Sequence, residues 1–584
     1  MSFYKQMEDG RKNKAYAMVP LLFFVAIAVF CLVLSPYRLG FKEQTSIFVL
    51  DRGFVSDYLS DPGFLAVMAG DFLSRFYWFN GMAVVLTLLS LVSVWAGLKM
   101  LLERSGEFEN ASLLALLPVC AETVFAVYLN YPVSATIGLA LSVWCAVLFS
   151  GSRIGNAILI PALAFGTSLL FVLAGGHALT FALLLLTMRY REWRKTLPAA
   201  VIGIGLMLLA GRFYNLNFIQ TLIWPVPNEY IVPPLSCLAI VPLLSVLCLT
   251  AGKRLSAFVC SLTACLALVP VFFLIRNERL ESSIRLGTTA YRQEWDKVRE
   301  LSESADSRSP YSTYYRNLCY AREGRLAEEL FRHPQNLGDG LFLSIQRGSS
   351  YLASFFFIDG LLEMGDVSQA TDAALLGQTV MPSRFSTRML RNLSEIAVLT
   401  GDYNVAGKYL NILSATPMHR RWARELRNCV DSDSLPERLQ RWRSRAALAD
   451  RTVAQGDWRA SLKNIADLNP MNRTAVDYLL CSMLLDKRGK SFEGYYERYW
   501  LDKLDRYYEV PPVYQQALLV NAYSDDSFRE IIGKYRIAGS VAERYMRFQN
   551  ALERSNGNLS ALGEYKDTYW YYIISTSIVE NPEQ

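Results

Sequence analysis

The sequence predicts an all-α protein, in which a transmembrane bundle of about nine helices is followed by a tetratricopeptide-like α-solenoid. Two observations support this fold class. Residues 15–275 consist mostly of Leu, Val, Ala, Ile and Phe, whereas residues 276–584 have the charged composition of a water-soluble domain. In the second half, short amphipathic helices end repeatedly at Gly. We therefore expect a cytoplasmic N-terminus (1–14), a transmembrane domain (15–275) and a periplasmic helical-repeat domain (276–584).

The transmembrane helices are predicted from apolar runs, since crossing a bilayer takes about 20 predominantly apolar residues. No small-residue cleavage site follows the first run, so we interpret it as an uncleaved signal anchor. The segment 156–188 is predicted either as two crossings or as a re-entrant pair, because its second half is short. The runs lie near residues 15–35, 79–101, 112–130, 133–149, 156–174, 176–188, 197–214, 235–251 and 255–275.

Lys and Arg residues are distributed unevenly between the two sides of these segments. They cluster at alternate segment ends, and loops rich in Lys and Arg lie in the cytoplasm. This asymmetry predicts a bacterial inner-membrane protein with a cytoplasmic N-terminus and a periplasmic C-terminal domain. The clusters are Lys5 to Lys14, Lys99 with Arg104, Arg153, Arg189 to Lys195, and Lys253 with Arg254.

Composition argues against several classes of function. The net charge of +6 is spread along the chain without a basic stripe, so nucleic acid is not expected as a partner. The ten Cys and three His residues have neither disulfide nor metal-ligand spacing. His177, between Gly176 and Ala178, is interpreted as a turn residue. No phosphate-binding loop, nucleophile elbow or zinc-protease motif is present in the sequence.

The first extracytoplasmic loop, residues 37–78, carries the acids that a membrane-surface site would need. Asp51 and Asp57 precede an expected amphipathic helix on the membrane surface, with Asp61 as its N-cap and Asp71 on its solvent-facing side. As catalytic residues, Asp51 or Asp57 would activate an acceptor hydroxyl as a general base, or hold a divalent cation on a phosphate. The alternative is that these acids only keep the loop soluble.

Three further charged residues are predicted to bind substrate, namely Glu122, Arg212 and Glu229. Glu122 lies about halfway along the third crossing and needs an interior partner or a proton. Arg212 closes the seventh crossing and is suited to a phosphate, and it pairs with Glu122 only if the helix ends converge. Glu229 belongs to the proline-rich loop 215–234, which we expect to cover the outer membrane face.

A recurring turn predicts the helical repeats of the second half. Helices end at Gly324, Gly365, Gly401 and Gly456, and the next helix begins with a small residue packed against the turn. Gly365 and Gly401 are 36 residues apart, close to the tetratricopeptide period of about 34. Each helix pair would bury its apolar face by stacking on the next. We expect a solenoid over residues 282–575, whose concave face would bind a periplasmic protein partner.

Several segments of the chain resemble an uncharacterised family of polytopic membrane proteins from Gram-negative bacteria, a domain of unknown function. They are RNLCYAREGRLAEELF, MPSRFSTRMLRNLSEIAVLTGDYNVAGKYLNIL, DYLLCSMLLDKRGKSFEGYY and DPGFLAVMAGDFLSRFYW. The resemblance runs along nearly the whole chain and implies no activity.

The layout of the chain is also similar to that of the GT-C glycosyltransferases. These enzymes take sugars from polyprenyl-phosphate carriers in the lipid bilayer and place them on outer-face acceptors, and their catalytic Asp lies in the first outer loop. The resemblance implies a membrane glycosyltransferase with Asp51 or Asp57 as its catalytic residue and a periplasmic acceptor. The family's paired acidic motif is not present here. One alternative is a non-catalytic, membrane-anchored helical-repeat scaffold for envelope assembly. Another is a transporter with Glu122 as proton carrier, which the lack of inverted repeats disfavours.

Overall fold

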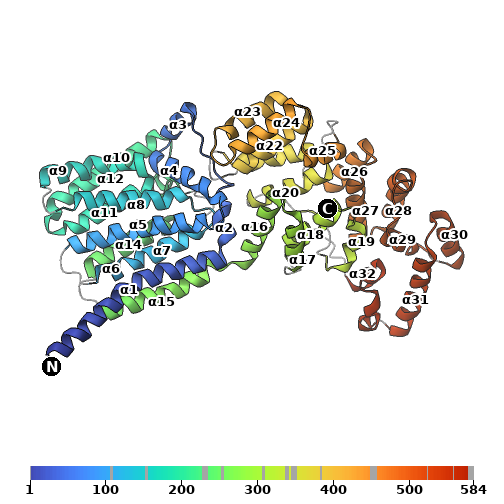
Figure 1. Cartoon of the computed structure of the whole chain (residues 1–584), viewed down its shortest axis with the longest axis horizontal. Coiled ribbons are helices and arrows are strands. Elements are labelled where there is room, and N and C mark those ends of the chain that lie inside the picture. Colours follow the sequence, from blue (N-terminus) through green and yellow to red (C-terminus); the bar gives the residue numbers. More distant parts are fainter. Residues whose placement is uncertain are drawn as a thin grey trace. The chain divides into compact units, whose positions relative to one another are not determined.

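The chain forms two compact units, each built from α-helices (Figure 1). Unit 1 comprises Met1–Ile284, Met381–Thr387 and Asn411–Ala423, and unit 2 comprises Arg285–Val380, Arg388–Leu410 and Arg424–Gln584. The computed structural model describes residues 2–105, 110–151, 155–226, 234–251, 256–304, 309–335, 341–343, 351–379, 381, 385–447, 457–522, 524–556 and 558–576. Every regular element in these ranges is helical, which confirms the predicted all-α class.

Unit 1 is a bundle of apolar helices joined by short turns. Its helices are α1 (Ser2–Leu34), α2 (Pro36–Phe41), α3 (Arg52–Leu59), α4 (Phe64–Ser74), η1 (Arg75–Trp78), α5 (Met82–Arg104), α6 (Ala111–Leu114), α7 (Leu116–Val127), α8 (Val133–Phe149), α9 (Asn156–Pro161), η2 (Ala162–Gly166), α10 (Thr167–Ala174), η3 (Gly175–His177), α11 (Ala178–Met188), η4 (Tyr190–Glu192), α12 (Trp193–Phe213), α13 (Phe218–Ile223), α14 (Pro234–Ala251) and α15 (Ala257–Ile275). Helix α16 (Glu278–Tyr291) runs across the boundary into unit 2.

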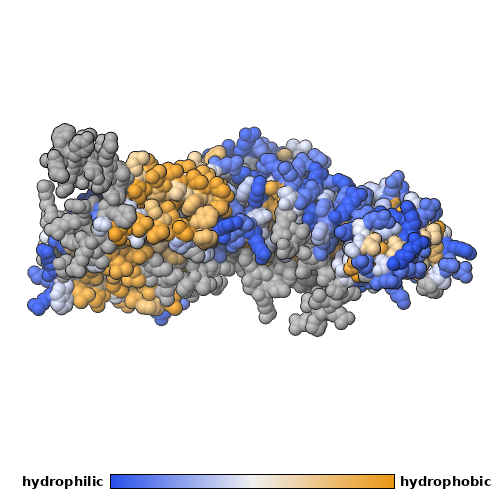
Figure 2. All heavy atoms as spheres, turned by 90° about the horizontal axis from the view of Figure 1, so that it is seen from below, coloured by the Kyte–Doolittle hydropathy of each residue, from blue (hydrophilic) through white to orange (hydrophobic). Residues whose placement is uncertain are grey.

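Three helical runs of the described residues are long and apolar enough to cross a membrane. They are Met82–Arg104, Ala157–Met188 and Trp193–Phe213, and a fourth is added if the bent pair Val259–Phe273 and Glu278–Tyr291 forms one span. The predicted count of nine is therefore larger than these residues support. Three further apolar helices are shorter, with 10–17 residues, namely Met18–Leu34, Ala111–Val127 and Val133–Phe149. Apolar residues also dominate the visible surface of unit 1 (Figure 2).

The run Ala157–Met188 folds back on itself. Gly175 interrupts it with a φ of 76° and a ψ of −154°, a conformation open to Gly and strained for other residues. Arg189, directly after the run, donates from Nη2 to the carbonyl of Gly151, just before it, at 3.1 Å. Because the two ends of the run meet, its helices form a hairpin that turns at Gly175–His177.

The hairpin turn lies at the end of unit 1 that also holds residues 35–79, here called the loop end. Gly63 N donates to the carbonyl of Phe171 at 3.0 Å, and Gly176 N donates to the carbonyl of Trp224 at 2.8 Å. The Trp224 indole in turn donates to the carbonyl of Pro62 at 2.5 Å. These contacts fix the turn between α3 and α4 against two other turns.

Helix α4 packs through one face against the other helices of unit 1. Its buried residues Ala66, Gly70 and Ser74 are four residues apart and share one face, and the helix packs against α8 and α10. A Cβ atom on Gly70 would lie 2.6 Å from the backbone N of Ser134. The small residues therefore let the backbones of α4 and α8 approach closely, an arrangement common between membrane helices.

Unit 2 consists of short helices that pack as neighbours, including α17 with α18, α20 with α21 and α26 with α27. Its helices are α17 (Trp295–Ser304), α18 (Pro310–Arg322), α19 (Leu326–Glu329), η6 (Leu330–Arg332), α20 (Tyr351–Met364), α21 (Val367–Thr379), α22 (Thr387–Thr400), α23 (Tyr403–Ser414), α24 (Arg420–Asp431), α25 (Glu437–Arg445), α26 (Trp458–Leu468), α27 (Arg473–Leu485), α28 (Gly489–Tyr495), η8 (Tyr496–Leu504), α29 (Pro512–Leu519), α30 (Asp525–Tyr535), α31 (Gly539–Ser555), η9 (Leu559–Tyr565) and α32 (Tyr569–Ser575). Thr387, the end of α23 and the start of α24 belong to unit 1.

The predicted Gly turns are present in unit 2. Gly324, Gly365 and Gly401 each follow the end of a helix and have positive φ values of 72°, 86° and 81°. This is the common left-handed end of a helix. Gly456 lies outside the described residues.

Candidate functional site

The two predicted catalytic acids lie on or next to the short helix α3. Asp51 is its N-cap, and its Oδ2 accepts a hydrogen bond from the backbone N of Gly53 at 2.9 Å. Asp57 lies on the helix itself, and both side chains are exposed. Asp51 therefore already has a structural role, because a capping carboxylate satisfies a backbone N–H that the helix leaves unpaired.

The structure contradicts the roles predicted for Asp61 and Asp71. Helix α4 begins at Phe64 with Gly63 as its N-cap, so Asp61 does not cap it. Asp71, expected on the solvent-facing side, is half-buried and accepts a hydrogen bond from the Tyr58 hydroxyl at 3.0 Å. The capping prediction is wrong because the turn before α4 is held by tertiary hydrogen bonds rather than by its own side chains.

Glu122, on α7, is completely buried and has polar partners in its own part of the bundle. It accepts hydrogen bonds from the Thr136 hydroxyl at 2.6 Å and from the Tyr131 hydroxyl at 3.0 Å. Arg212, suggested as its partner, is exposed at the end of α12. The nearby charge is Lys42, whose Nζ donates to the carbonyls of Ala126 and Tyr131 at 2.6 and 2.8 Å.

Burial dominates the chemistry of Lys42, which follows α2 at the loop end. It lowers the pKa of the ammonium to about 7, helped by the positive charge of Arg38 and opposed by the carboxylate of Glu122. A lysine with carbonyl acceptors on neighbouring turns holds those turns together. The predicted substrate-binding residue Glu229 lies outside the described residues. The predicted site residues are thus divided between the exposed helix α3, the buried face of α7 and the exposed end of α12.

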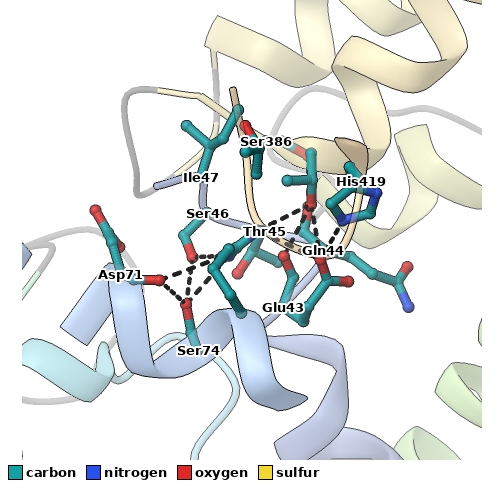
Figure 3. A network of polar contacts seen from close by, with 12 residues as sticks. Glu43, Gln44, Thr45, Ser46, Ile47, Asp71, Ser74, Ser386 and His419 are labelled. Atoms are coloured by element: carbon teal, nitrogen blue, oxygen red, sulfur yellow. Dashed lines mark hydrogen bonds and ion pairs between the residues drawn. The ribbon is translucent and has the colours of Figure 1, made fainter. Parts of the chain in front are cut away.

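The main buried charge cluster of the loop end was not predicted. Glu43, after α2, accepts a hydrogen bond from Arg75 Nη1 at 3.3 Å and lies 2.6 Å from His419 Nε2 (Figure 3). Thr387 donates to the backbone carbonyl of Glu43 at 2.9 Å, and Ser386 donates to that of Gln44 at 2.6 Å. All of these side chains are buried. Two segments from late in the chain, 381–387 and 411–423, are therefore held on the loop after α2.

The cluster continues through hydroxyl groups toward α4. Arg75 Nη2 donates to the hydroxyl of Ser46 at 2.6 Å and to that of Ser74 at 3.1 Å, while its Nε donates to the carbonyl of Asp71 at 3.2 Å. The two serine hydroxyls are 3.0 Å apart. Arg75 is 0% exposed, and its Nη1 also donates to the hydroxyl of Thr387 at 3.5 Å, so its guanidinium has acceptors from three segments. A buried charge with this many partners is expensive to disturb.

A local signal for part of this cluster exists in the sequence. Lys42 and Glu43 are adjacent charged residues directly after an apolar run and a short turn, where side chains of this type need partners. Their partners are not local, since Glu43 and His419 are 376 positions apart. The described residues contain no group of three or more His, Cys, Asp or Glu side chains arranged to hold a metal ion.

Asp71 makes the loop end sensitive to pH. Burial raises the pKa of its carboxyl to about 6, against the opposing effects of Arg75, Tyr58 and Ser46. Between the unfolded value of 3.8 and about 6 the folded protein keeps a proton that the unfolded chain has lost, so stability falls as pH rises. The loss in the free energy of unfolding, up to about 3 kcal/mol, is complete above pH 6.

We therefore expect Asp71→Asn to remove this component of the pH dependence. The free energy of unfolding in detergent would be measured from pH 4 to pH 7 for the natural chain and the variant. The natural chain should lose stability relative to Asp71→Asn between pH 4 and pH 6, and the difference should then be constant. The exposed Asp57→Asn is the matched control and should follow the natural chain. A difference independent of pH would contradict the burial of Asp71.

The described residues define the class of protein. They form an all-helical chain whose apolar helices are compatible with a membrane. The chain belongs to a family of unknown function, DUF6057, whose model matches residues 12–576. This match confirms the resemblance to an uncharacterised family along nearly the whole chain. No curated protein and no solved structure matches the chain.

Proposed function

We propose that this protein is a membrane-anchored helical scaffold rather than an enzyme whose active site lies in the loop 37–78. The observation that supports the proposal is that charged groups at the loop end make structural contacts. Asp51 caps a helix, while Glu43 and Arg75 are buried in a cluster that holds residues 386, 387 and 419 on this loop. These groups stabilise an arrangement of chain segments. A scaffold needs such rigidity, because it must present its helical-repeat surface to envelope partners in one conformation.

Glycosyl transfer from a polyprenyl-phosphate-linked donor remains the catalytic alternative, with Asp51 or Asp57 as general base or as ligand of a divalent cation. The two functions differ in what a carboxylate at these positions must do. A general base typically contributes about 10²–10⁴-fold to rate, whereas an exposed acid of a scaffold contributes less than about 0.5 kcal/mol to stability.

Complementation of a deletion strain separates the two functions. Under the scaffold proposal, Asp51→Asn and Asp57→Asn complement fully at equal protein level. Asn caps a helix about as well as Asp at position 51, and Asp57 is an exposed residue of the helix. Asp61→Asn is the neighbouring control and should be silent under either function. Failure of Asp57→Asn to complement, together with an altered glycan profile of envelope proteins and lipids, would contradict the scaffold proposal and support the glycosyltransferase function.

We also propose the predicted orientation, with a cytoplasmic N-terminus and a periplasmic solenoid. Two basic residues assigned to the cytoplasm lie at one end of unit 1, which supports the alternation. Arg104 donates to the hydroxyl of Ser150 at 3.3 Å, and Arg189 donates to the carbonyl of Gly151 at 3.1 Å. Reporter fusions after Arg104, Arg194 and Arg276 should report cytoplasm, cytoplasm and periplasm. A cytoplasmic signal after Arg276 would overturn the topology.

A further inference from the structure

Exposed aromatic side chains mark one level of unit 1, at its loop end. Phe79 lies three residues before α5, Tyr128 directly follows α7 and Phe213 ends α12, and their exposed fractions are 49%, 46% and 85%. Aromatic side chains concentrate where membrane helices meet water. Helices α5 and α12 are two of the candidate spans, so this level is the membrane–water interface of the placement proposed above.

A segment from late in the chain is held at the same level. The ring of His419 contacts the ring of Trp78, the neighbour of Phe79, edge-on with the centroids 5.4 Å apart. Glu43 fixes His419 from the other side at 2.6 Å. Arg420 directly follows His419, and consecutive Cα atoms are about 3.8 Å apart, so Arg420 begins close to this aromatic contact.

The next two residues are exposed arginines. Arg420 Nε donates to the carbonyl of Ser414 at 3.0 Å, which is the one polar contact of Arg420 within the described parts of the chain. Its two terminal nitrogens are therefore turned to the surroundings, and Arg421 beside it is also exposed. A guanidinium binds phosphate oxygens through two parallel N–H bonds, and it is hydrated more weakly than an ammonium.

We propose that Arg420 and Arg421 bind the phosphate groups of anionic phospholipids at the membrane interface of the loop end. The ligand is a lipid because headgroup phosphates are the anions found at the depth that the exposed aromatic residues mark. Each arginine near an anionic membrane surface strengthens binding by about fivefold. This inference rests on the proposed membrane placement, and it adds lipid recognition to the scaffold.

The test uses the purified full-length chain in detergent micelles, titrated with phosphatidylglycerol or phosphatidylcholine, with binding followed by tryptophan fluorescence. The chain should prefer phosphatidylglycerol. The Arg420→Gln, Arg421→Gln double variant should bind it about 25-fold more weakly, with binding of phosphatidylcholine unchanged. Each single variant should lose about fivefold and serves as the test if the double variant does not purify. Arg529→Gln, an exposed arginine of α30, is the control and should bind like the natural chain.

Three outcomes would overturn the proposal. Equal binding of phosphatidylglycerol by the natural chain and the variants would show that the two arginines do not bind the lipid. Competition by soluble glycerol 3-phosphate at the same phosphate concentration would show a site for free phosphate instead of lipid. Release of the natural chain from membranes by alkaline carbonate would overturn the membrane placement itself, whatever the two arginines bind.

Discussion

Replacing Arg75 with Met should destabilise unit 1 by about 3–5 kcal/mol, the usual cost of removing one partner of a buried ion pair. The cost arises because Glu43 would keep its charge in a site that excludes water. A loss of this size is a large part of the 5–15 kcal/mol that stabilises a typical domain. Thermal unfolding in detergent and the yield of monodisperse protein would measure it.

A second substitution shows whether the unpaired charge is the cause. In the Glu43→Gln, Arg75→Met double variant neither charge remains, so much of the lost stability should return, since buried pairs replaced together are often nearly neutral. Asp57→Asn, an exposed acid of the same loop, should remain within about 0.5 kcal/mol of the natural chain. If Arg75→Met alone unfolds like the natural chain, the cluster is not shielded from water.

The largest effect in unit 2 is expected at Glu363, the completely buried acid near the end of α20. Its carboxylate accepts hydrogen bonds from Arg445 Nη1 and from the Trp442 indole, each at 2.9 Å, and forms a close ion pair with Arg322. Arg441 lies 3.6 Å away. One carboxylate thus lies among three guanidinium groups from α18 and α25. In Glu363→Gln these charges would repel one another without compensation, so we expect a loss of at least 3–5 kcal/mol.

Hydrogen–deuterium exchange of the full chain would locate this effect. Peptides from α18, α20 and α25 should exchange faster in Glu363→Gln, while peptides from unit 1 should keep their protection. Arg441→Gln is the matched control, because that side chain is 28% exposed and at the rim of the cluster. Its cost should be below about 1 kcal/mol. Equal protection in Glu363→Gln and Arg441→Gln would contradict a central role for Glu363.

The helical class and the ends of several helices were predictable because they follow from local patterns. Gly365 and Gly401 end helices through a backbone conformation that their own residue type favours. The start of α4 was not predictable from Asp61 and Pro62 in the same way. There a hydrogen bond from Gly63 N to the carbonyl of Phe171 decides the geometry, and its acceptor is more than 100 residues away.

The two candidate catalytic acids, Asp51 and Asp57, were predicted because they stand out in the sequence, and both are exposed. The buried cluster contains residues that look ordinary in sequence, since Glu43, Arg75 and His419 have no motif spacing among them. A charge pattern shows which groups need partners, and tertiary structure decides which groups obtain them. The count of membrane spans failed for a related reason, because apolar runs of 17 residues or fewer indicate buried bundle helices as well as crossings.

The composition of unit 1 also sets an order of events during synthesis. Arg75 and His419 are separated by 344 residues, which take roughly 20 to 70 s to translate at 5–20 residues per second. Throughout this interval the first loop of the bundle is already made, but the histidine that completes its charge cluster is not. The N-terminal half of the chain therefore cannot complete the folding of unit 1 without the later segments. A chain released by the ribosome before residue 423 would lack part of it.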